Sequence, residues 1–297
     1  MGDLSVKSAQ HLSERNEYLV HVLKDIQALD IMLHEGMFET GKQRIGAEQE
    51  LCLIDDEGNP ALTAPAILES ITDPHFTTEI GKFNLEINLD PFEIRSDCLR
   101  NTERQLFELL GALGNKASDA DSNILLTGIL PSLTHLHLQE ECMAPVERYR
   151  ILSNAMRAMR GRDFEVHIIG VDELIASNPS ILFEACNTSF QMHLQIEPDE
   201  FVAHYNWAQM ISGPVLAACT NSPLLFGREL WAETRIALFQ QSVDTRSYTG
   251  HLRDRQSRVY FGNRWLRSSV SEVFKEHLTR FPLVFSTKIE KNTSVFY

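Results

Sequence analysis

Two glutamates stand two residues apart in the segment RIGAEQELCLI, which occupies residues 44–54. The segment predicts a β-strand, and side chains two apart on a strand share a face. Glu48 and Glu50 are therefore expected side by side, with little near them in the sequence to neutralise them. Carboxylates in such a pair repel each other, and they hold their protons more tightly unless a cation lies among them.

Two later segments carry the same asymmetry, FNLEINL at 83–89 and SFQMHLQI at 189–196. In each, apolar side chains alternate with polar ones, which is typical of a sheet with one face in the core. The polar face carries Glu86 in the first segment and His193 in the second. The predicted core face of the second segment consists of its apolar residues: Phe190, Met192, Leu194 and Ile196.

If the three strands are neighbours, the sheet presents one polar floor with four potential ligands: Glu48, Glu50, Glu86 and His193. Carboxylate oxygens with one imidazole suit Mg²⁺ or Mn²⁺. Because Mg²⁺ keeps few protein ligands and usually shares its shell with phosphates, the floor predicts a divalent metal together with a nucleotide. The alternative is that each polar face simply meets water, as in many antiparallel sheets.

The composition narrows the class of protein. The chain has 297 residues, 43% of them hydrophobic, and a formal net charge of −14. This excess of acid argues against nucleic acid or an anionic membrane as the main partner. The N-terminal stretch lacks the apolar region of a secretory signal, and no apolar run approaches the roughly 18 residues of a membrane span. The five cysteines form no CxxC pair, so a cytoplasmic protein with reduced thiols is predicted.

Periodicity predicts a mixture of strands and helices. Strands are expected at 44–54, 82–90, 124–128 and 187–197, with a turn at 55–60. Helices are expected at 8–36, 98–117, 145–160, 198–218, 227–242 and 268–280. Because strands and helices do not alternate regularly, an α+β fold is favoured over a parallel doubly wound sheet.

An ordered set of motifs gives the chain a resemblance to a known family. The motifs are G-x-E-x-E at 46–50, L-E-x-x-x-x-P at 85–91, the polar-faced strand with His193, N-S-P at 221–223 and GRELWAETR at 227–235. In this order they resemble the glutamate–cysteine ligase type 2 family of carboxylate–amine ligases. The resemblance covers about residues 40–245.

The resemblance implies a curved antiparallel β-sheet with helices packed on one face, similar to the catalytic domain of glutamine synthetase. This domain would occupy residues 41–297, after a helical segment at residues 1–40. The implied activity is the joining of a carboxylate to an amine through an acyl phosphate, with ATP and Mg²⁺ (or Mn²⁺) as cofactors. Glutamate is the favoured acid, the amine stays open, and a homo-oligomer is compatible with the resemblance.

Individual roles follow from the matching positions. Arg235, on the predicted helix after the N-S-P turn, would meet phosphate or the substrate carboxylate, because a guanidinium fork binds both. Glu86 and Arg235 are thus the expected catalytic residues, and Arg228 and Arg235 are the expected nucleotide-binding residues. The positions that match metal ligands are Glu48, Glu50, Glu86 and His193.

The C-terminal part departs from the family pattern. Family members continue with further strands, one of which carries Glu and Arg, and neither residues 252–254 nor residues 288–290 match it. The resemblance therefore predicts either a fragment or a shortened member of the family, and in both cases part of the active-site wall would be absent.

Two other classes of function stay open. Strand rise alone would put the carboxyls of Glu48 and Glu50 roughly 6–7 Å apart, which is compatible with a metal-dependent hydrolase or an acid–base pair for glycoside cleavage. The other class is a non-catalytic domain that binds a metabolite or a partner chain. Its contact surface would be the aromatic residues near the end: Phe281, Phe285, Phe296 and Tyr297.

Three further features predict structure more than chemistry. His135 and His137 are expected on a loop or an edge element. Cys186 has no base partner in the sequence and is expected to be a buried thiol. The basic cluster at 148–162, with Arg150, Arg157 and Arg160 near one helix face, is expected to be solvated, or alternatively to be an access route for an anion.

Overall fold

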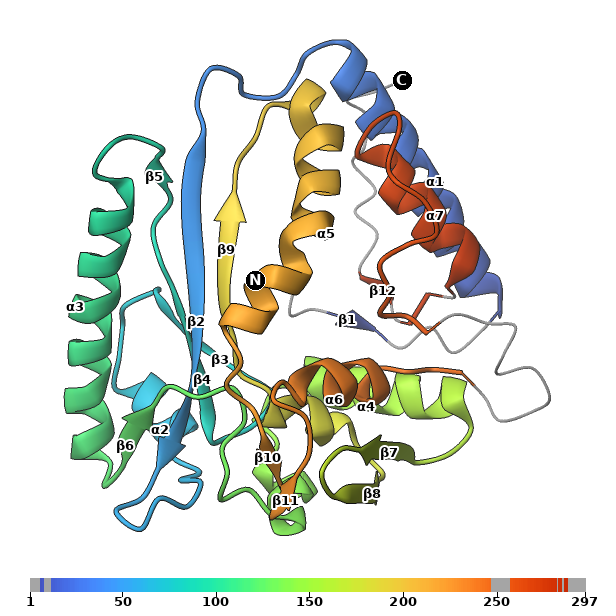
Figure 1. The fold of residues 1–297 in the computed structure, drawn as a ribbon. Coiled ribbons are helices and arrows are strands. Elements are labelled where there is room, and N and C mark those ends of the chain that lie inside the picture. Colours follow the sequence, from blue (N-terminus) through green and yellow to red (C-terminus); the bar gives the residue numbers. More distant parts are fainter. Residues whose placement is uncertain (1–5, 8–11, 247–256, 282, 285, 288–297) are drawn as a thin grey trace.

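One long strand, β2 (Arg44–Ile54), organises the main sheet of the computed structural model, which describes residues 6–7, 12–246, 257–281, 283–284 and 286–287. Along one edge β2 pairs with β4 (Asn84–Asn88) and β5 (Phe92–Glu93). Along the other edge it pairs with β9 (Phe190–Leu194) and β6 (Asn123–Leu125). β3 (Phe76–Thr78) extends the sheet beyond β4. Every pairing is antiparallel, so the predicted α+β class is confirmed (Figure 1).

One face of this sheet is an apolar core. Leu51 and Leu53 of β2 and Leu85 and Ile87 of β4 are fully buried there against α2 (Ala64–Glu69) and α3 (Cys98–Asp119). Figure 1 shows α3 running along this side of the sheet. Each fully buried leucine of this kind stabilises the fold by about 1.5–3 kcal/mol. The alternation in β2 and β4 therefore fixes which residues point to the opposite, polar face.

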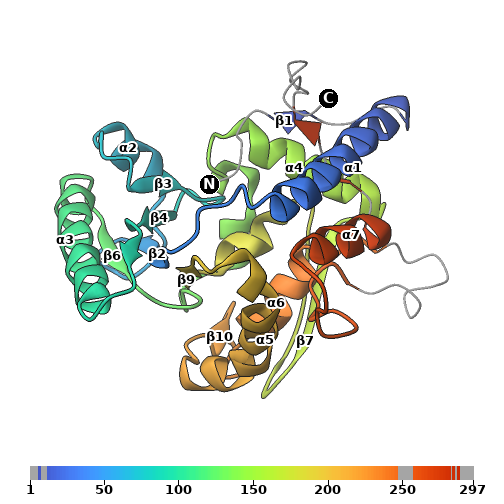
Figure 2. The same ribbon diagram turned by 90° about the horizontal axis from the view of Figure 1, so that it is seen from above.

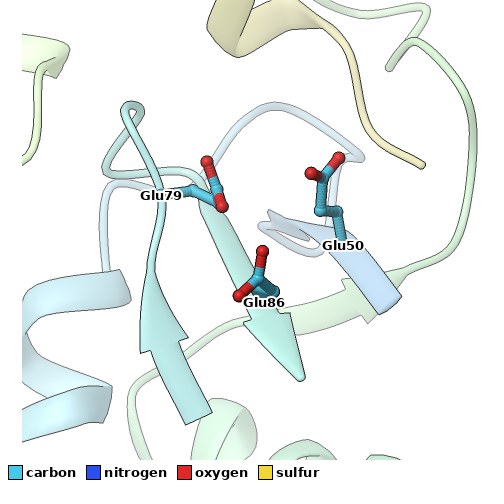
Figure 3. A group of neighbouring side chains, drawn as sticks. All are labelled: Glu50, Glu79 and Glu86. Atoms are coloured by element: carbon cyan, nitrogen blue, oxygen red, sulfur yellow. The ribbon is translucent and has the colours of Figure 1, made fainter. Parts of the chain in front are cut away.

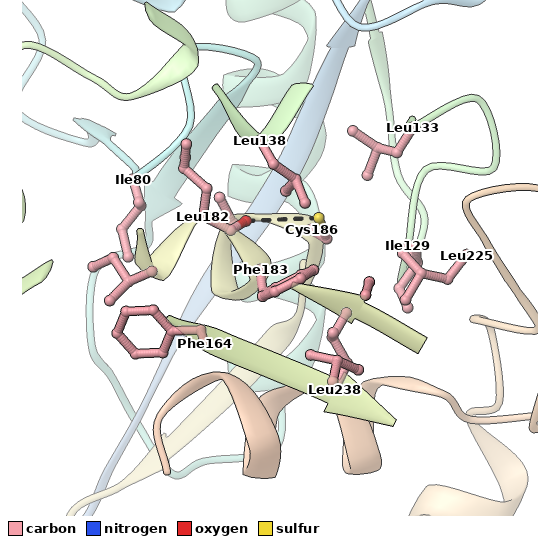
Figure 4. Packing of buried hydrophobic residues seen from close by; sticks show 14 of the residues in the cluster. Ile80, Ile129, Leu133, Leu138, Phe164, Leu182, Phe183, Cys186, Leu225 and Leu238 are labelled. Atoms are coloured by element: carbon pink, nitrogen blue, oxygen red, sulfur yellow. Dashed lines mark hydrogen bonds between the residues drawn. The ribbon is translucent and has the colours of Figure 1, made fainter. Parts of the chain in front are cut away.

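A second core covers one end of the opposite face. The hairpin of β7 (Phe164–Ile169) and β8 (Glu173–Asn178) packs there with η3 (Ile181–Cys186, a 3₁₀-helix) and α6 (Arg235–Ser242). Figure 4 shows Phe164, Phe183 and Leu238 in this cluster, and Cys186 donating a hydrogen bond to the carbonyl oxygen of Leu182. Cys52 of β2 belongs to the same cluster. This core holds η3 and the start of α6 beside the polar face of the sheet.

The remaining elements flank these two layers. α1 (Leu12–His34) lies beside α7 (Ser271–Arg280), where Lys275 pairs with Asp30 at 2.7 Å (Figures 1 and 2). β1 (Val6–Lys7) pairs with β12 (Ser286–Thr287). After β9 the chain passes through η4 (Pro198–Glu200) into α5 (Phe201–Ala218). Among the described residues, none of the helices has both the length and the apolar composition that a membrane crossing requires.

Most of the predicted elements are confirmed with shifted ends. The strand predicted at 44–54 has the bounds of β2, and the helix predicted at 98–117 is α3. α4 (Glu147–Arg160) begins two residues later than predicted, and α7 begins three residues later. The strands predicted at 82–90, 124–128 and 187–197 are shorter, because only part of each run pairs with β2.

The helix predicted at 227–242 is wrong in its first half. Residues 224–229 form a hairpin of β10 (Leu224–Leu225) and β11 (Arg228–Glu229), and α6 begins only at Arg235. The turn residues Phe226 and Gly227 have φ angles of 49° and 72°. Positive φ at both central residues is typical of a tight hairpin turn and is incompatible with a right-handed helix. The hairpin β7–β8 was not predicted either, although β7 alternates strictly between buried and exposed residues.

The prediction that the apolar side of β9 faces the core is also wrong. Phe190, Met192 and Leu194 share one side of the strand as predicted, but they are 46%, 57% and 49% exposed. α3 packs on β2, β5 and β6, which leaves this side of β9 uncovered among the described residues. Alternation defines which side chains share a face, whereas burial requires a second layer over that face.

The basic cluster divides between the surface and the interior. Arg150 and Arg157 are exposed and pair with Glu147 and Asp163. Arg160, in contrast, is 5% exposed, and its guanidinium donates to carbonyl oxygens of Asp244 at 3.0 Å and Glu165 at 3.3 Å. The interpretation of a solvated face therefore fails for Arg160.

Parts of the sequence predictions lie outside the described residues. These are the segments 252–254 and 288–290, together with Phe285, Phe296 and Tyr297. Phe281 is described; it is partly buried against the rings of Tyr260 and His277.

The close approach of two backbones at Gly170 generates a stability prediction. A Cβ at this position would lie 2.5 Å from the backbone of Leu230, so Gly170→Ala should lower the free energy of unfolding by about 2 kcal/mol through overpacking. Gly111→Ala is the matched control, because its Cβ would meet nothing within 4 Å inside α3. This control should gain about 0.5–1 kcal/mol. Urea unfolding followed by circular dichroism measures both, and equal effects would contradict the packing at Gly170.

Candidate functional site

The strand register brings the predicted polar residues onto one face. Glu50 of β2 lies directly opposite Glu86 of β4, and Glu48 lies between Asn88 of β4 and Gln191 of β9. His193 lies opposite Gly46, on the same face as Glu48 and Glu50. The three strands are thus neighbours, as the sequence predicted, and β2 lies in the middle.

Three carboxylates converge at the centre of this face (Figure 3). Glu50, Glu79 and Glu86 each offer an oxygen, and these atoms all lie within 4.8 Å of one another. Glu79 follows β3, and it comes from a different segment than the two strand residues. We refer to these three residues as the acidic cluster.

Burial and mutual repulsion set the charge of the acidic cluster. Burial, followed by the charges of Glu184, Glu50 and Glu86, raises the pKa of Glu79 to about 9. Burial also raises the pKa of Glu50, although a hydrogen bond from the Ser189 hydroxyl at 3.1 Å opposes the shift. Without a cation, the cluster therefore retains protons at neutral pH.

A fourth carboxylate, Glu184 on η3, faces the same region. Its burial, and then the charge of Glu50, raise the pKa of Glu184 to about 7. Acidic groups from β2, β4, the residue after β3 and η3 thus lie around one small volume. Such a volume favours a cation over any anion.

Neighbouring donors fix the orientation of Glu86. Its Oε1 accepts hydrogen bonds from the Thr77 hydroxyl at 3.0 Å and from the Asn88 amide at 2.7 Å. Farther along β4 on the same face, the buried Oδ1 of Asn84 has no partner in the described part of the chain. Oxygen ligands that are oriented in advance fit a hard divalent cation such as Mg²⁺ or Mn²⁺.

Glu48 and His193 lie beside the acidic cluster and form a pair of their own. His193 Nε2 is 3.7 Å from Glu48 Oε1, and the histidine side chain is 53% exposed. The four predicted metal ligands therefore share one face, but only Glu50 and Glu86 converge with Glu79.

Arg235, the first residue of α6, is held tightly at the edge of this site. Its Nε and Nη2 donate to the two carboxylate oxygens of Glu233, and its Nη1 donates to the carbonyl oxygen of Thr188 at 2.8 Å. The hydrogen bonds to Glu233, and then the charges of Glu233 and Glu50, raise the pKa of Arg235. The guanidinium is therefore near Glu50 and stays charged. It also leaves no room for a Cβ at Gly128, which would lie 2.9 Å from Arg235 Cζ.

Arg228 lies on β11 and not on the helix that the sequence predicted. Its side chain is exposed and makes no hydrogen bond or ion pair with another described residue. The structure therefore does not link Arg228 to the acidic cluster through any polar contact of the described residues.

Sequence reasoning missed Glu79 and Glu184. A signal for Glu79 was present, because Thr77 and Glu79 alternate with the apolar Phe76 and Ile80 just before the strand that carries Glu86. For Glu184 the signal is a single carboxylate inside the apolar run ILFEAC, where an ionised side chain is costly unless it has a partner.

Two other candidate groups have structural roles. His137 lies on η1 (His135–Leu138), where its Nδ1 accepts a hydrogen bond from the backbone N–H of Thr134, and His135 packs on the ring of Phe226. This confirms the prediction that neither is on a central strand. Cys186 is buried as predicted, and its burial raises the pKa of the thiol.

The carboxylate pKa values generate a pH prediction. A carboxyl whose pKa is raised in the folded state, as for Glu79, stabilises the protein most below its unfolded pKa of about 4.5. That contribution is lost as the pH rises toward about 9. Without divalent cations, thermal stability should therefore fall between pH 5 and pH 9, and Glu79 contributes about one proton to this dependence beside Glu50 and Glu184. Glu79→Gln should flatten this slope, whereas Glu57→Gln in an exposed turn should not, and parallel curves would contradict the assignment.

The Glu233–Arg235 pair generates a stability prediction. Glu233 is 5% exposed, and it also accepts a hydrogen bond from the Ser222 hydroxyl at 2.6 Å. Glu233→Ala leaves these donors unpaired and should lower the free energy of unfolding by about 2 kcal/mol. Glu229→Ala on the exposed hairpin is the control and should change it by less than about 0.5 kcal/mol. Urea unfolding at pH 7 compares the two, and similar losses would show that the pair does not stabilise the fold.

The comparison with known families covers most of the site. The profile of glutamate-cysteine ligase family 2 (GCS2) matches residues 44–277. This interval contains β2, β4, β9 and α6, and with them the acidic cluster, Glu48, His193 and both arginines. A comparison with individually curated proteins finds no match. Because the family profile matches more than half of the chain, the protein belongs to glutamate-cysteine ligase family 2.

Proposed function

We propose that the chain is an ATP- and Mg²⁺-dependent carboxylate–amine ligase that forms an amide bond through an acyl phosphate, with glutamate as the acid. Membership of glutamate-cysteine ligase family 2 indicates a ligase of the carboxylate–amine kind. The observation that carries the finer proposal is the convergence of Glu50, Glu79 and Glu86 on the polar face of the sheet. An antiparallel sheet with α2 and α3 on the opposite face supports a fold similar to that of glutamine synthetase.

The acidic cluster is the proposed metal site. Bound Mg²⁺ would neutralise charge on the phosphates during phosphoryl transfer. Glu50, Glu79 and Glu86 would hold the ion, since their oxygens already lie close together and one oxygen of Glu86 is fixed by Thr77 and Asn88. Glu48 and His193 would supply further ligands at the edge of the same floor.

Arg235 is the proposed anchor for phosphate or for the substrate carboxylate. Nη1 and Nη2 each use one hydrogen in the contacts to Thr188 and Glu233, so each keeps a second hydrogen for a ligand. Because the guanidinium is already oriented, binding a ligand would require little reorganisation. Arg228 is proposed as a second, more mobile contact to the nucleotide, since its side chain is exposed.

The test is a calorimetric titration with ADP. We expect ADP to bind only with Mg²⁺ present, and Glu86→Gln to weaken this binding by at least tenfold, which is about 1.4 kcal/mol. Glu93→Gln is the matched control, because it changes a carboxylate on β5 of the same sheet that is outside the cluster. Unchanged affinity in Glu86→Gln would refute the metal assignment. Turnover without nucleotide would favour a metal-dependent hydrolase over a ligase.

A metal titration separates the acidic cluster from its neighbours. Electron paramagnetic resonance of free Mn²⁺ gives the dissociation constant. This constant should rise at least tenfold more in Glu79→Gln than in His193→Gln, because Glu79 lies inside the cluster and His193 is exposed beside it. A larger loss of Mn²⁺ binding in His193→Gln would move the metal site to the Glu48–His193 pair.

A further inference from the structure

A cavity outside the acidic cluster has the features of a second binding site. It measures about 320 Å³ and lies where α4 faces two segments: the turn between β8 and η3, and the connection from η1 to η2 (Glu140–Cys142). This volume is within the range of small-molecule sites. The residues that form it take no part in the proposed ligase site.

One wall of the cavity is a row of hydrogen-bond donors. Arg150, Asn154 and Arg157 line it from α4, and their spacing of four and then three residues places them on one helix face. Arg150 pairs with Glu147 through Nη2, and Arg157 pairs with Asp163 through Nη2 at 2.7 Å. Within the described part of the chain, Nε and Nη1 of both arginines and the amide of Asn154 make no hydrogen bond. As far as the described residues go, the row therefore presents N–H groups that a ligand can accept.

The existing ion pairs do not prevent ligand binding. The side chains of Arg150 and Arg157 are 59% and 50% exposed. Exposed ion pairs contribute little to stability because water and salt screen them. A ligand anion can therefore bind the guanidinium groups together with these carboxylates, or displace the carboxylates, at a low cost in free energy.

The floor of the cavity is hydrogen-bonded to neighbouring segments and partly apolar. The Asn178 amide donates to the carbonyl oxygen of Leu138 at 2.8 Å, and its oxygen accepts from the backbone N–H of Ser180 at 2.8 Å. The Ser153 hydroxyl oxygen accepts from the backbone N–H of Ile181. Leu138 and Met143 are buried beside these groups. Since the polar atoms of the floor are already engaged, the uncharged part of a ligand would lie on the apolar side chains.

The charge of the lining selects the class of ligand. The lining carries two arginines and one carboxylate, Glu140, and the carboxylates of Glu147 and Asp163 that pair with the arginines are not part of the lining. We propose that this cavity binds a small organic anion, with its phosphate or carboxylate group between Arg150 and Arg157. Guanidinium groups match both oxyanions through paired N–H donors. The two arginines donate hydrogen bonds and cannot ligate a metal ion, which distinguishes this cavity from the acidic cluster.

Calorimetry with the whole chain tests this site independently of ligase activity. The titrants are inorganic phosphate, phenyl phosphate and succinate, in low-salt buffer with EDTA so that no divalent cation bridges an anion to the carboxylates. We expect one site per chain for the preferred oxyanion, and tighter binding of phenyl phosphate than of inorganic phosphate if the ligand is a phosphate ester. Succinate as the tightest titrant would identify a carboxylate ligand.

Matched variants locate the binding. Arg150→Gln and Arg157→Gln should each weaken binding at least tenfold, and Asn154→Ala should weaken it severalfold without changing the charge. Arg148→Gln is the control, since it removes the same charge from the same helix outside the cavity, and it should change the affinity less than twofold. These positions are exposed or partly exposed, so thermal unfolding should confirm intact folding. Absence of binding to the unmodified chain, or an equal loss in Arg148→Gln, would overturn the proposal.

Discussion

Repulsion among carboxylates in a partly buried position is the constraint on which this structure depends. Glu50, Glu79 and Glu86 place oxygens within 4.8 Å of one another, and Glu184 adds a fourth acidic group nearby. In water such charges would separate, but here β2, β3, β4 and η3 hold them together. The protein must therefore keep protons on them or place a cation among them. Holding these carboxylates together costs free energy, and the burial of the two apolar cores offsets this cost.

The two cores lie on opposite sides of β2 and determine where the polar face can be. The core formed with α2 and α3 buries one side of β2 and β4, so every second residue must point away from it. The second core covers only one end of the other side, through the β7–β8 hairpin, η3 and α6. The acidic cluster is thus partly buried, which raises the pKa values of Glu50 and Glu79. The same packing places Arg235 at the start of α6, where Glu233 and Thr188 fix its direction.

The acidic cluster and the cavity beside α4 collect charged side chains in different ways. The acidic cluster collects carboxylates from β2, β4, the residue after β3 and η3, whereas the cavity beside α4 collects arginines from a single helix face. The difference follows from how each group of side chains is brought together. Arginines at helical spacing align on their own helix, but the carboxylates meet only after distant segments pair. Under the two proposals, the acidic cluster would bind a cation and the cavity would bind an anion.

The sequence by itself determined which side chains share a face of each strand or helix. Alternation placed Glu48 and Glu50 on one face of β2 and Glu86 on the corresponding face of β4, and the ordered motifs indicated the family that the profile match confirms. The sequence also indicated that Cys186 is buried and that His135 and His137 lie off the central strands. These are local properties, because a period of two residues or of 3.6 residues can be recognised from consecutive residues of the sequence.

The tertiary structure alone decided which groups meet. It brought Glu79 and Glu184 to Glu50, placed His193 beside Glu48 and outside the cluster, and turned residues 224–229 into a hairpin before α6. It also left Phe190 and its apolar neighbours on β9 exposed, although their alternation predicts a buried face. The physical reason is that convergence and burial depend on contacts between segments far apart in the sequence. Periodicity describes one element at a time and does not specify what packs against it.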